Sequence, residues 1–219
     1  GTMLNYKGEV RDTFAITKSD DVPVARTPIE NPWQPGGKTA SDEKRGGQRL
    51  PKNHVALLKR GASSSYLAGG EPQRNWTSPD FDDSAWKKGK AGFGYGDRDD
   101  ATELEDMSKN YKTVYIRRGF DVPTGVSAAD VGLAISYDDG FIAYLNGKEI
   151  LRVGVDSGSG KTAKGFHPHE ANKQFEYFSF KGKEKLLNTG ANVIAIEGHN
   201  ANLESSDFSL HPSVIMNKK

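Results

Sequence analysis

The Asn-Gly dipeptide at residues 146–147 constrains the fold more than any other feature of the sequence. Apolar stretches flank it on both sides, and both of its residues accept the positive φ angles of a type I′ turn, which joins adjacent antiparallel strands directly. The sequence therefore predicts a β-hairpin with strands over residues 141–146 and 149–153. The Asp-Asp-Gly run at 138–140 is a second tight-turn signal, so we expect residues 131–137 to extend this hairpin into a three-stranded meander.

Apolar residues recur with a period of two through the rest of the chain after residue 52, as in strands that turn one face to a core. Helical periodicity is nearly absent and no strand-helix-strand rhythm is present. The pattern predicts an all-β fold, a jelly-roll β-sandwich of about eight or more antiparallel strands. The expected strands cover residues 54–60, 111–122, 131–137, 141–146, 149–153, 175–180, 192–199 and 208–215.

Residues 1–52 differ in character from the rest of the chain. They are rich in proline, glycine pairs and charge, a composition that buries little apolar surface and interrupts strand pairing. A strand or two within residues 6–17 is the only regular structure that we expect there. We therefore divide the chain into an irregular linker, or the tail of an upstream domain, over 1–52 and a β-sandwich domain over 53–219.

Composition excludes several functional classes. Lys and Arg total 30 against 29 Asp and Glu, so no strong field favours a nucleic-acid partner. The chain has no cysteine, which excludes thiolate metal sites and cysteine nucleophiles. The longest apolar runs are strand-sized, so we expect no membrane span.

Several blocks of sequence, in order over residues 55–215, resemble the galactose-binding-domain-like jelly rolls. This family includes the sugar-binding domains of β-galactosidase-type hydrolases and accessory modules of large secreted bacterial proteins. The blocks are FDDSAW at 81–86, AGFGYGD at 91–97, TVYIRRGFDVP at 113–123, SYDDGFIAYLNG at 136–147 and NVIAIE at 192–197.

The resemblance implies a β-sandwich that binds carbohydrate through loops at one end, often with a structural calcium ion. It leads us to expect a non-catalytic, monomeric, carbohydrate-binding or carbohydrate-associated accessory module of a larger extracytoplasmic protein, with a glycan or neighbouring domains as partners. The alternative is a structural module that packs beside a hydrolase or phosphoesterase domain and binds no small ligand. Exposed aromatic residues beside the polar loops would favour the first, and an exposed apolar patch on a sheet face the second.

Polar residues at the ends of expected strands form the candidate binding site, because carboxylates, amides and hydroxyls can grip sugar hydroxyls. The alternative is that Asp138 only caps its turn and that Glu197 pairs with Arg117 or Arg118 on a neighbouring strand. The candidate ligand-binding residues are Tyr95, Asp97, Asp138, Asp139, His199, Asn200 and Asp207.

An acidic run after residue 96 offers the oxygen ligands that a calcium ion requires, with Asp97, Asp99 and Asp100 as the candidate metal ligands. The run lacks the EF-hand pattern, and a solvated loop is the alternative. No nucleophile elbow or zinc-protease motif is present, so we name no catalytic residue. Among the aromatic residues, we expect Trp86 to be a core anchor, while Trp76 is as consistent with an exposed position as with a packed one.

Overall fold

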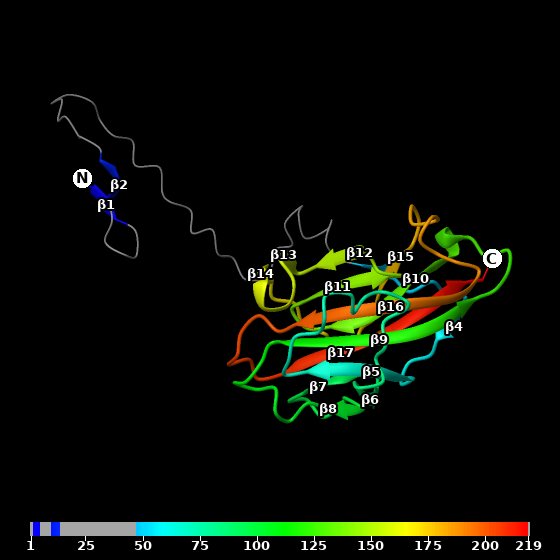
Figure 1. The fold of residues 1–219 in the computed structure, drawn as a ribbon, viewed down its shortest axis with the longest axis horizontal. Coiled ribbons are helices and arrows are strands. Elements are labelled where there is room, and N and C mark those ends of the chain that lie inside the picture. Colours follow the sequence, from blue (N-terminus) through cyan, green and yellow to red (C-terminus); the bar gives the residue numbers. More distant parts are fainter. Residues whose placement is uncertain (1, 5–9, 14–46, 219) are drawn as a thin grey trace. The chain divides into compact units, whose positions relative to one another are not determined.

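The computed structural model describes residues 2–4, 10–13 and 47–218 (Figure 1). They fall into two units: one within Gly1–Gly37, which contains an antiparallel pair of strands, β1 (Thr2–Leu4) and β2 (Val10–Thr13), and one within Lys38–Lys219, which contains the sandwich. Strand β2 falls in the stretch where one or two strands are expected. The boundary at residue 52 stays a prediction, since most of the predicted flank lies outside the described residues.

Two β-sheets form the sandwich, as the sequence predicts. The seven-stranded sheet follows the order β3 (Gln48–Arg49), β15 (Glu176–Ser179), β10 (Val131–Tyr137), β17 (Phe208–Asn217), β7 (Phe93–Tyr95) and β8 (Thr102–Glu103), and β4 (His54–Leu58) also pairs with β17. The six-stranded sheet follows the order β12 (Lys148–Val153), β11 (Gly140–Leu145), β16 (Gly190–His199), β9 (Thr113–Val122), β5 (Ser63–Ala68) and β6 (Lys87–Lys90).

Short elements complete the domain. A small two-stranded sheet consists of β13 (Val155–Ser157) and β14 (Lys164–Phe166), and the 3-10 helices are η1 (Ala128–Asp130) and η2 (Gly160–Thr162). Within the described ranges, no helix has the length and apolarity needed to cross a membrane. The all-β fold class is confirmed.

The core lies between the two sheets and is filled by alternate residues of their strands. On β9, Val114, Ile116 and Phe120 face the core, whereas Tyr115 faces away from it. Strand β10 is buried along its whole length, so both of its faces are covered. The outer faces of both sheets therefore carry further packed layers as well as solvent-exposed surface.

The predicted hairpin is confirmed. Asn146 and Gly147 have φ angles of 48° and 85° and connect β11 directly to β12. The Asn146 side chain also holds the turn to the next strand: its Oδ1 accepts a hydrogen bond from the Val193 amide at 2.7 Å, and its Nδ2 donates to the Leu186 carbonyl at 2.8 Å.

The predicted meander is wrong in its first strand. Strand β10 pairs with β15 and β17 in one sheet, while β11 pairs with β12 and β16 in the other. The Asp138-Asp139 turn thus carries the chain from one sheet to the other. Its amides donate to carbonyls outside the turn, from Asp138 to Ser209 at 2.9 Å and from Asp139 to His169 at 2.8 Å. Alternating apolar residues reveal that a segment is a strand, but they do not show with which other strand it pairs.

The expectation that Trp86 anchors the core is also wrong. Trp86 is only partly buried, and it packs on Trp76 at 6.0 Å between ring centroids. Trp76 is the more buried residue, with Tyr115 and Tyr144 around it in a second hydrophobic cluster. This cluster lies on the outer face of the six-stranded sheet, because Tyr115 is on the side of β9 that faces away from the core.

Candidate functional site

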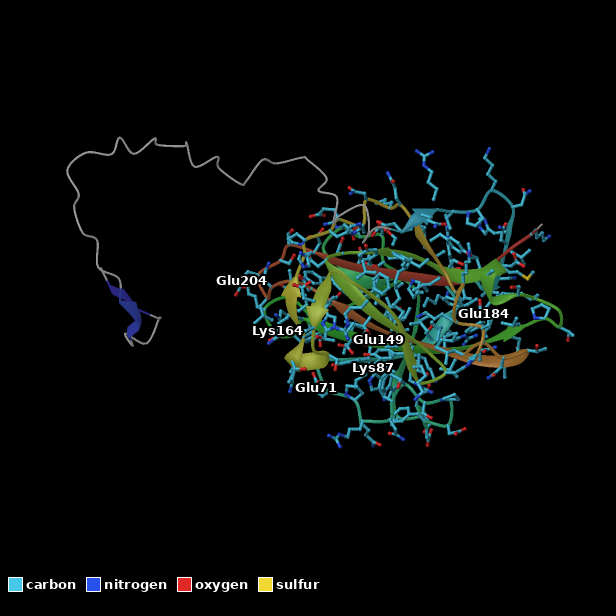
Figure 2. All side chains as sticks on the ribbon, turned by 90° about the horizontal axis from the view of Figure 1, so that it is seen from above. Glu71, Lys87, Glu149, Lys164, Glu184 and Glu204 are labelled. Atoms are coloured by element: carbon cyan, nitrogen blue, oxygen red, sulfur yellow. The ribbon has the colours of Figure 1, made fainter. Side chains whose placement is uncertain are left out.

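Loops gather at one end of the sandwich because neighbouring strands begin or end there. His199, the last residue of β16, pairs with both Gly140 at the start of β11 and Thr113 at the start of β9. In the other sheet, Phe208 at the start of β17 pairs with Tyr95 at the end of β7. In Figure 1 this loop end also carries β13 and β14. Figure 2 shows Glu71, Lys164 and Glu204 at the loop end and Glu184 at the opposite end.

Tyr95, Asn200 and Asp207, three of the predicted site residues, meet in one hydrogen-bonded group. The Asn200 side-chain amide donates to the Tyr95 hydroxyl at 3.2 Å and to the Asp207 carbonyl at 3.1 Å. Tyr95 in turn donates to the Ser205 carbonyl at 2.9 Å. These bonds hold the loop after β16 against the end of β7.

Asp138 and Asp139 lie beside this group, and their carboxylates hold neighbouring loops. Asp138 accepts a hydrogen bond from the Ala171 amide at 2.7 Å, and Asp139 accepts one from the Ala201 amide at 2.7 Å. Burial raises the pKa of Asp138 to about 6, and the negative charges of Asp207, Glu170 and Asp139 add to the effect. The Asp138 carboxylate therefore holds a loop in place. This structural role is similar to the turn-capping role that the sequence offers as the alternative to ligand binding.

His199 is fully buried and forms a pair with Glu197, whose Oε1 lies 2.7 Å from His199 Nε2. The other ring nitrogen of His199 lies 3.2 Å from the Thr113 hydroxyl, and the Gly160 amide donates to Glu197. The alternative pairing of Glu197 with Arg117 or Arg118 is not formed among the described residues: Glu197 bonds His199 and Gly160, and Arg117 bonds Asp83 at 3.0 Å.

The structure thus brings most of the predicted binding residues to one end of the fold, where their polar side-chain atoms are largely bonded to neighbouring protein groups. One exception is Asn200 Oδ1, which is buried and accepts no hydrogen bond from the described residues. Asp97 is exposed and lies apart from this group, near Asp99. Ligand binding by these residues stays a prediction.

A cleft of about 360 Å³ opens at the same end, above the His199 ring. It lies between the loops that follow β5 and β16, the loop that precedes β9, and the η2–β14 segment. The lining residues are Gly69, Gly70, Glu71, Asn110, Tyr111, Lys112, Thr113, Gly160, Lys161, Ala163, Phe166 and Leu203.

The cleft wall combines aromatic and charged side chains. The Phe166 ring lies 5.6 Å from the His199 ring, and the Lys112 ammonium lies 4.8 Å from the Phe166 centroid. Leu203, at 36% exposure, is the one large exposed hydrophobic side chain in the described part of the chain, and it lies on the cleft. Sequence reasoning missed these residues, because they come from loops and from the short strand β14, none of which carries a motif.

Below the cleft, the Tyr115 hydroxyl is buried and has no hydrogen-bond partner among the described residues. A Cβ atom on Gly160 would overlap both this hydroxyl and the Glu71 carboxylate, so Gly160 and Glu71 lie directly over Tyr115. Burial and the charges of Glu197 and Glu71 raise the pKa of Tyr115, which keeps the hydroxyl protonated as a hydrogen-bond donor.

A separate cluster of metal-ligating residues consists of Asp99, Asp100 and His211, whose ligand atoms all lie within 4.8 Å of one another. Two of these are predicted metal ligands, and the third, His211, was missed. The sequence does place His211 next to Leu210 in an expected strand. Because neighbouring residues of a strand point to opposite faces and Leu210 faces the core, His211 faces the outer side of the seven-stranded sheet. The third predicted ligand, Asp97, is not in the cluster but lies close to Asp99.

No protein-family model matches the chain, and no curated protein matches it. Solved structures with a similar fold include β-glucuronidases. That of Ruminococcus gnavus in complex with D-glucuronic acid has a TM-score of 0.47 and 11% identity, over 80% of this chain and 32% of its own. That of an uncultured Clostridium species has a TM-score of 0.46 and 16% identity, over 79% and 31% of the two chains.

A calcium-binding mutant of Bacteroides uniformis β-glucuronidase 2 has a TM-score of 0.42 and 16% identity, over 73% of this chain and 18% of its own. The chain thus spans a third or less of these proteins. Function has to be argued from the residues of this chain, since a fold hosts many functions.

Proposed function

We propose that this chain is a non-catalytic carbohydrate-binding module and that the cleft at the loop end holds the glycan. The observation that carries the proposal is the composition of the cleft. About 360 Å³ lies within the usual size of small-molecule sites, and aromatic rings lie there beside amide, ammonium and carboxylate groups. Such a lining suits a sugar, which offers an apolar ring face together with a rim of hydroxyls.

The position of the exposed apolar surface supports a carbohydrate-binding module over a module that only packs beside another domain. A packing module would present an apolar patch on a sheet face, whereas Leu203, the large exposed hydrophobic residue of the described part, belongs to the cleft. Phe166 and Tyr111 are partly exposed beside it, where a binding module would have its aromatic residues.

The carboxylates support a role without catalysis. Glycoside hydrolysis by the usual routes takes two carboxyl groups that flank the bond to be cleaved. Glu71 is the one carboxylate among the lining residues of the cleft, and the nearby Glu197 is buried and bonded to His199 and Gly160. Binding is therefore the chemistry that this arrangement favours.

The remaining parts of the proposal come from the sequence resemblance to galactose-binding-like accessory modules. We propose that the module acts as a monomer within a larger extracytoplasmic protein, which itself is a hydrolase or a related enzyme. The resemblance also implies a structural calcium ion, and of its candidate ligands Asp97, Asp99 and Asp100 the last two lie in one metal-ligating cluster with His211.

Isothermal titration of the 219-residue chain with a panel of neutral and acidic mono- and oligosaccharides tests the proposal. We expect one sugar class to bind at a single site. Lys112→Ala and Phe166→Ala should each weaken that binding about 10-fold, which corresponds to about 1.4 kcal/mol. Lys148→Ala is the matched control, because it removes an exposed lysine outside the cleft and should leave affinity unchanged.

Urea unfolding of each variant separates loss of the cleft from loss of the fold. If both cleft variants kept the wild-type affinity for sugar, the cleft would not be the binding site. A chain that binds no sugar in the panel, while its fold is intact, would favour the packing module.

A further inference from the structure

The outer face of the seven-stranded sheet carries a metal-ligating cluster that is independent of the cleft. Its histidine, His211, comes from β17, and its carboxylates, Asp99 and Asp100, come from the loop between β7 and β8. The His211 Nε2 atom lies 2.8 Å from Asp100 Oδ1. The Asp100 side chain is 1% exposed and that of His211 22%, so the cluster lies mostly below the surface.

Glycines in and beside β7 create the space for this cluster. A Cβ atom on Gly92 would overlap the His211 ring, and a Cβ atom on Gly94 would overlap the Asp100 carboxylate and the Phe208 carbonyl. The His211 ring therefore lies directly against the backbone of Gly92, just before β7, and the Asp100 carboxylate lies against that of Gly94, within β7. A buried carboxylate and an imidazole fit there because these two residues have no side chain of their own.

Two carboxylate oxygens in the cluster lack donors. Asp99 Oδ1 and Asp100 Oδ2 are buried, and no nitrogen or hydroxyl of the described residues donates a hydrogen bond to them. Leaving a buried charged acceptor without a partner is costly, because the lost hydration is not replaced by a hydrogen bond. These oxygens therefore point to a species that the protein itself does not supply, such as a cation.

The charges around the cluster favour a cation as well. Asp97 lies beside Asp99, so a third carboxylate adds negative charge next to the cluster. The Lys173 ammonium lies 3.2 Å from Asp99 Oδ2, on the exposed side, and leaves Oδ1 free.

We propose that Asp99, Asp100 and His211 bind a divalent transition-metal ion of the zinc type, with water as the remaining ligand. One imidazole nitrogen and two carboxylate oxygens match the ligands of zinc sites. Calcium fits less well, since it takes about 6–8 oxygen ligands and an imidazole offers none. The ion replaces the proton between His211 and Asp100 and fastens the loop after β7 to β17.

Isothermal titration of the metal-free 219-residue chain with Zn²⁺ is the first test. We expect one strong site per chain and, in excess Zn²⁺, a higher thermal midpoint that a chelator reverses. Asp99→Asn and His211→Ala should each weaken this affinity by more than about 10-fold. Asp99 is partly exposed, so the asparagine variant should fold even where a change at the buried Asp100 does not.

His167→Ala is the matched control. It also removes an imidazole that lies 2.8 Å from a carboxylate, that of Asp156, but this pair is exposed and belongs to no cluster of three metal-ligating residues in the described part. Zn²⁺ affinity should be unchanged in this variant. The imidazole ¹⁵N resonances of His211, and not those of His167, should shift when Zn²⁺ is added.

Three outcomes would overturn the proposal. The first is the absence of strong Zn²⁺ binding to the folded chain. The second is binding that survives both Asp99→Asn and His211→Ala. The third is a midpoint raised by Ca²⁺ but not by Zn²⁺, which would point instead to the calcium site that the sequence resemblance implies.

Discussion

Asp138 is a buried carboxyl at the turn where the chain passes from one sheet to the other. Its side chain accepts a hydrogen bond from the Ala171 amide and is 7% exposed as a residue. Ionisation is unfavourable there because burial and the nearby carboxylates of Asp207, Glu170 and Asp139 raise its pKa to about 6 from 3.8. The fold uses this carboxyl as an acceptor, and an amide oxygen would serve equally.

Asp138→Asn should therefore stabilise the protein at neutral pH. Between about pH 4 and 6 the folded state keeps a proton on Asp138 that the unfolded chain has lost, so this group makes the wild-type less stable as pH rises. We expect the variant and the wild-type to have the same free energy of unfolding at pH 4. At pH 7 the variant should be more stable by about 1 kcal/mol, a value smaller than the full pKa shift implies because solvent screens part of the effect. Urea unfolding at both pH values measures this difference.

Asp80→Asn, at an exposed position, serves as the control and should change stability little at either pH. Equal effects of Asp138→Asn at pH 4 and pH 7 would contradict the raised pKa.

At the scale of elements, the loop between β5 and β6 packs on the outer face of the six-stranded sheet. Trp76 fixes this loop through its contacts with Tyr115 and Tyr144, at 5.2 and 5.6 Å between ring centroids. The Arg117 guanidinium ties the loop further, since it donates to the Trp76 carbonyl and to Asp83. The turn around Asp82-Asp83-Ser84 is thus structural, as its residue types suggest.

Trp76→Ala should destabilise the domain more than Trp86→Ala. Trp76 is 7% exposed, and truncating a buried aromatic residue costs about 3–5 kcal/mol. Trp86 is partly buried at the edge of the same cluster, so we expect roughly half that cost. Chemical unfolding of both variants, followed by tyrosine and tryptophan fluorescence, gives the two free energies. The reverse order would mean that Trp86 is the anchor after all.

At the scale of the whole molecule, the two proposed sites lie on different sheets. The cleft is lined by Thr113 of β9, in the six-stranded sheet, whereas His211 belongs to β17, in the seven-stranded sheet. The core fills the space between these sheets. A ligand at one site therefore has no direct contact with a ligand at the other.

The stabilising effects of sugar and Zn²⁺ should consequently add. A ligand that binds only the folded state raises its stability by mass action, and two uncoupled sites contribute independently. Unfolding free energies measured with each ligand alone and with both together test this expectation. A combined effect clearly different from the sum would show that the sites communicate, through the β7 and β16 loops that meet at Asn200 and Tyr95.

The sequence by itself determined the strands with strong alternation and the hairpin at Asn146-Gly147, because period-two burial and positive φ are local properties of the chain. It also indicated that polar residues such as Asn200 and Asp207 would meet at one end. Tertiary structure decided which strands share a sheet: β10 and β11 are joined by a tight turn yet separate, since their partners β17 and β16 come from much later in the chain.

The same limit applies to the sites. Asp99 and Asp100 were visible as an acidic run, but their imidazole partner, His211, is more than a hundred residues away and reaches them only because β17 pairs with β7. The cleft depends in the same way on Glu71, Lys112 and Phe166, which come from three different segments. Local sequence thus sets the conformation of each segment, whereas long-range pairing decides which side chains face each other.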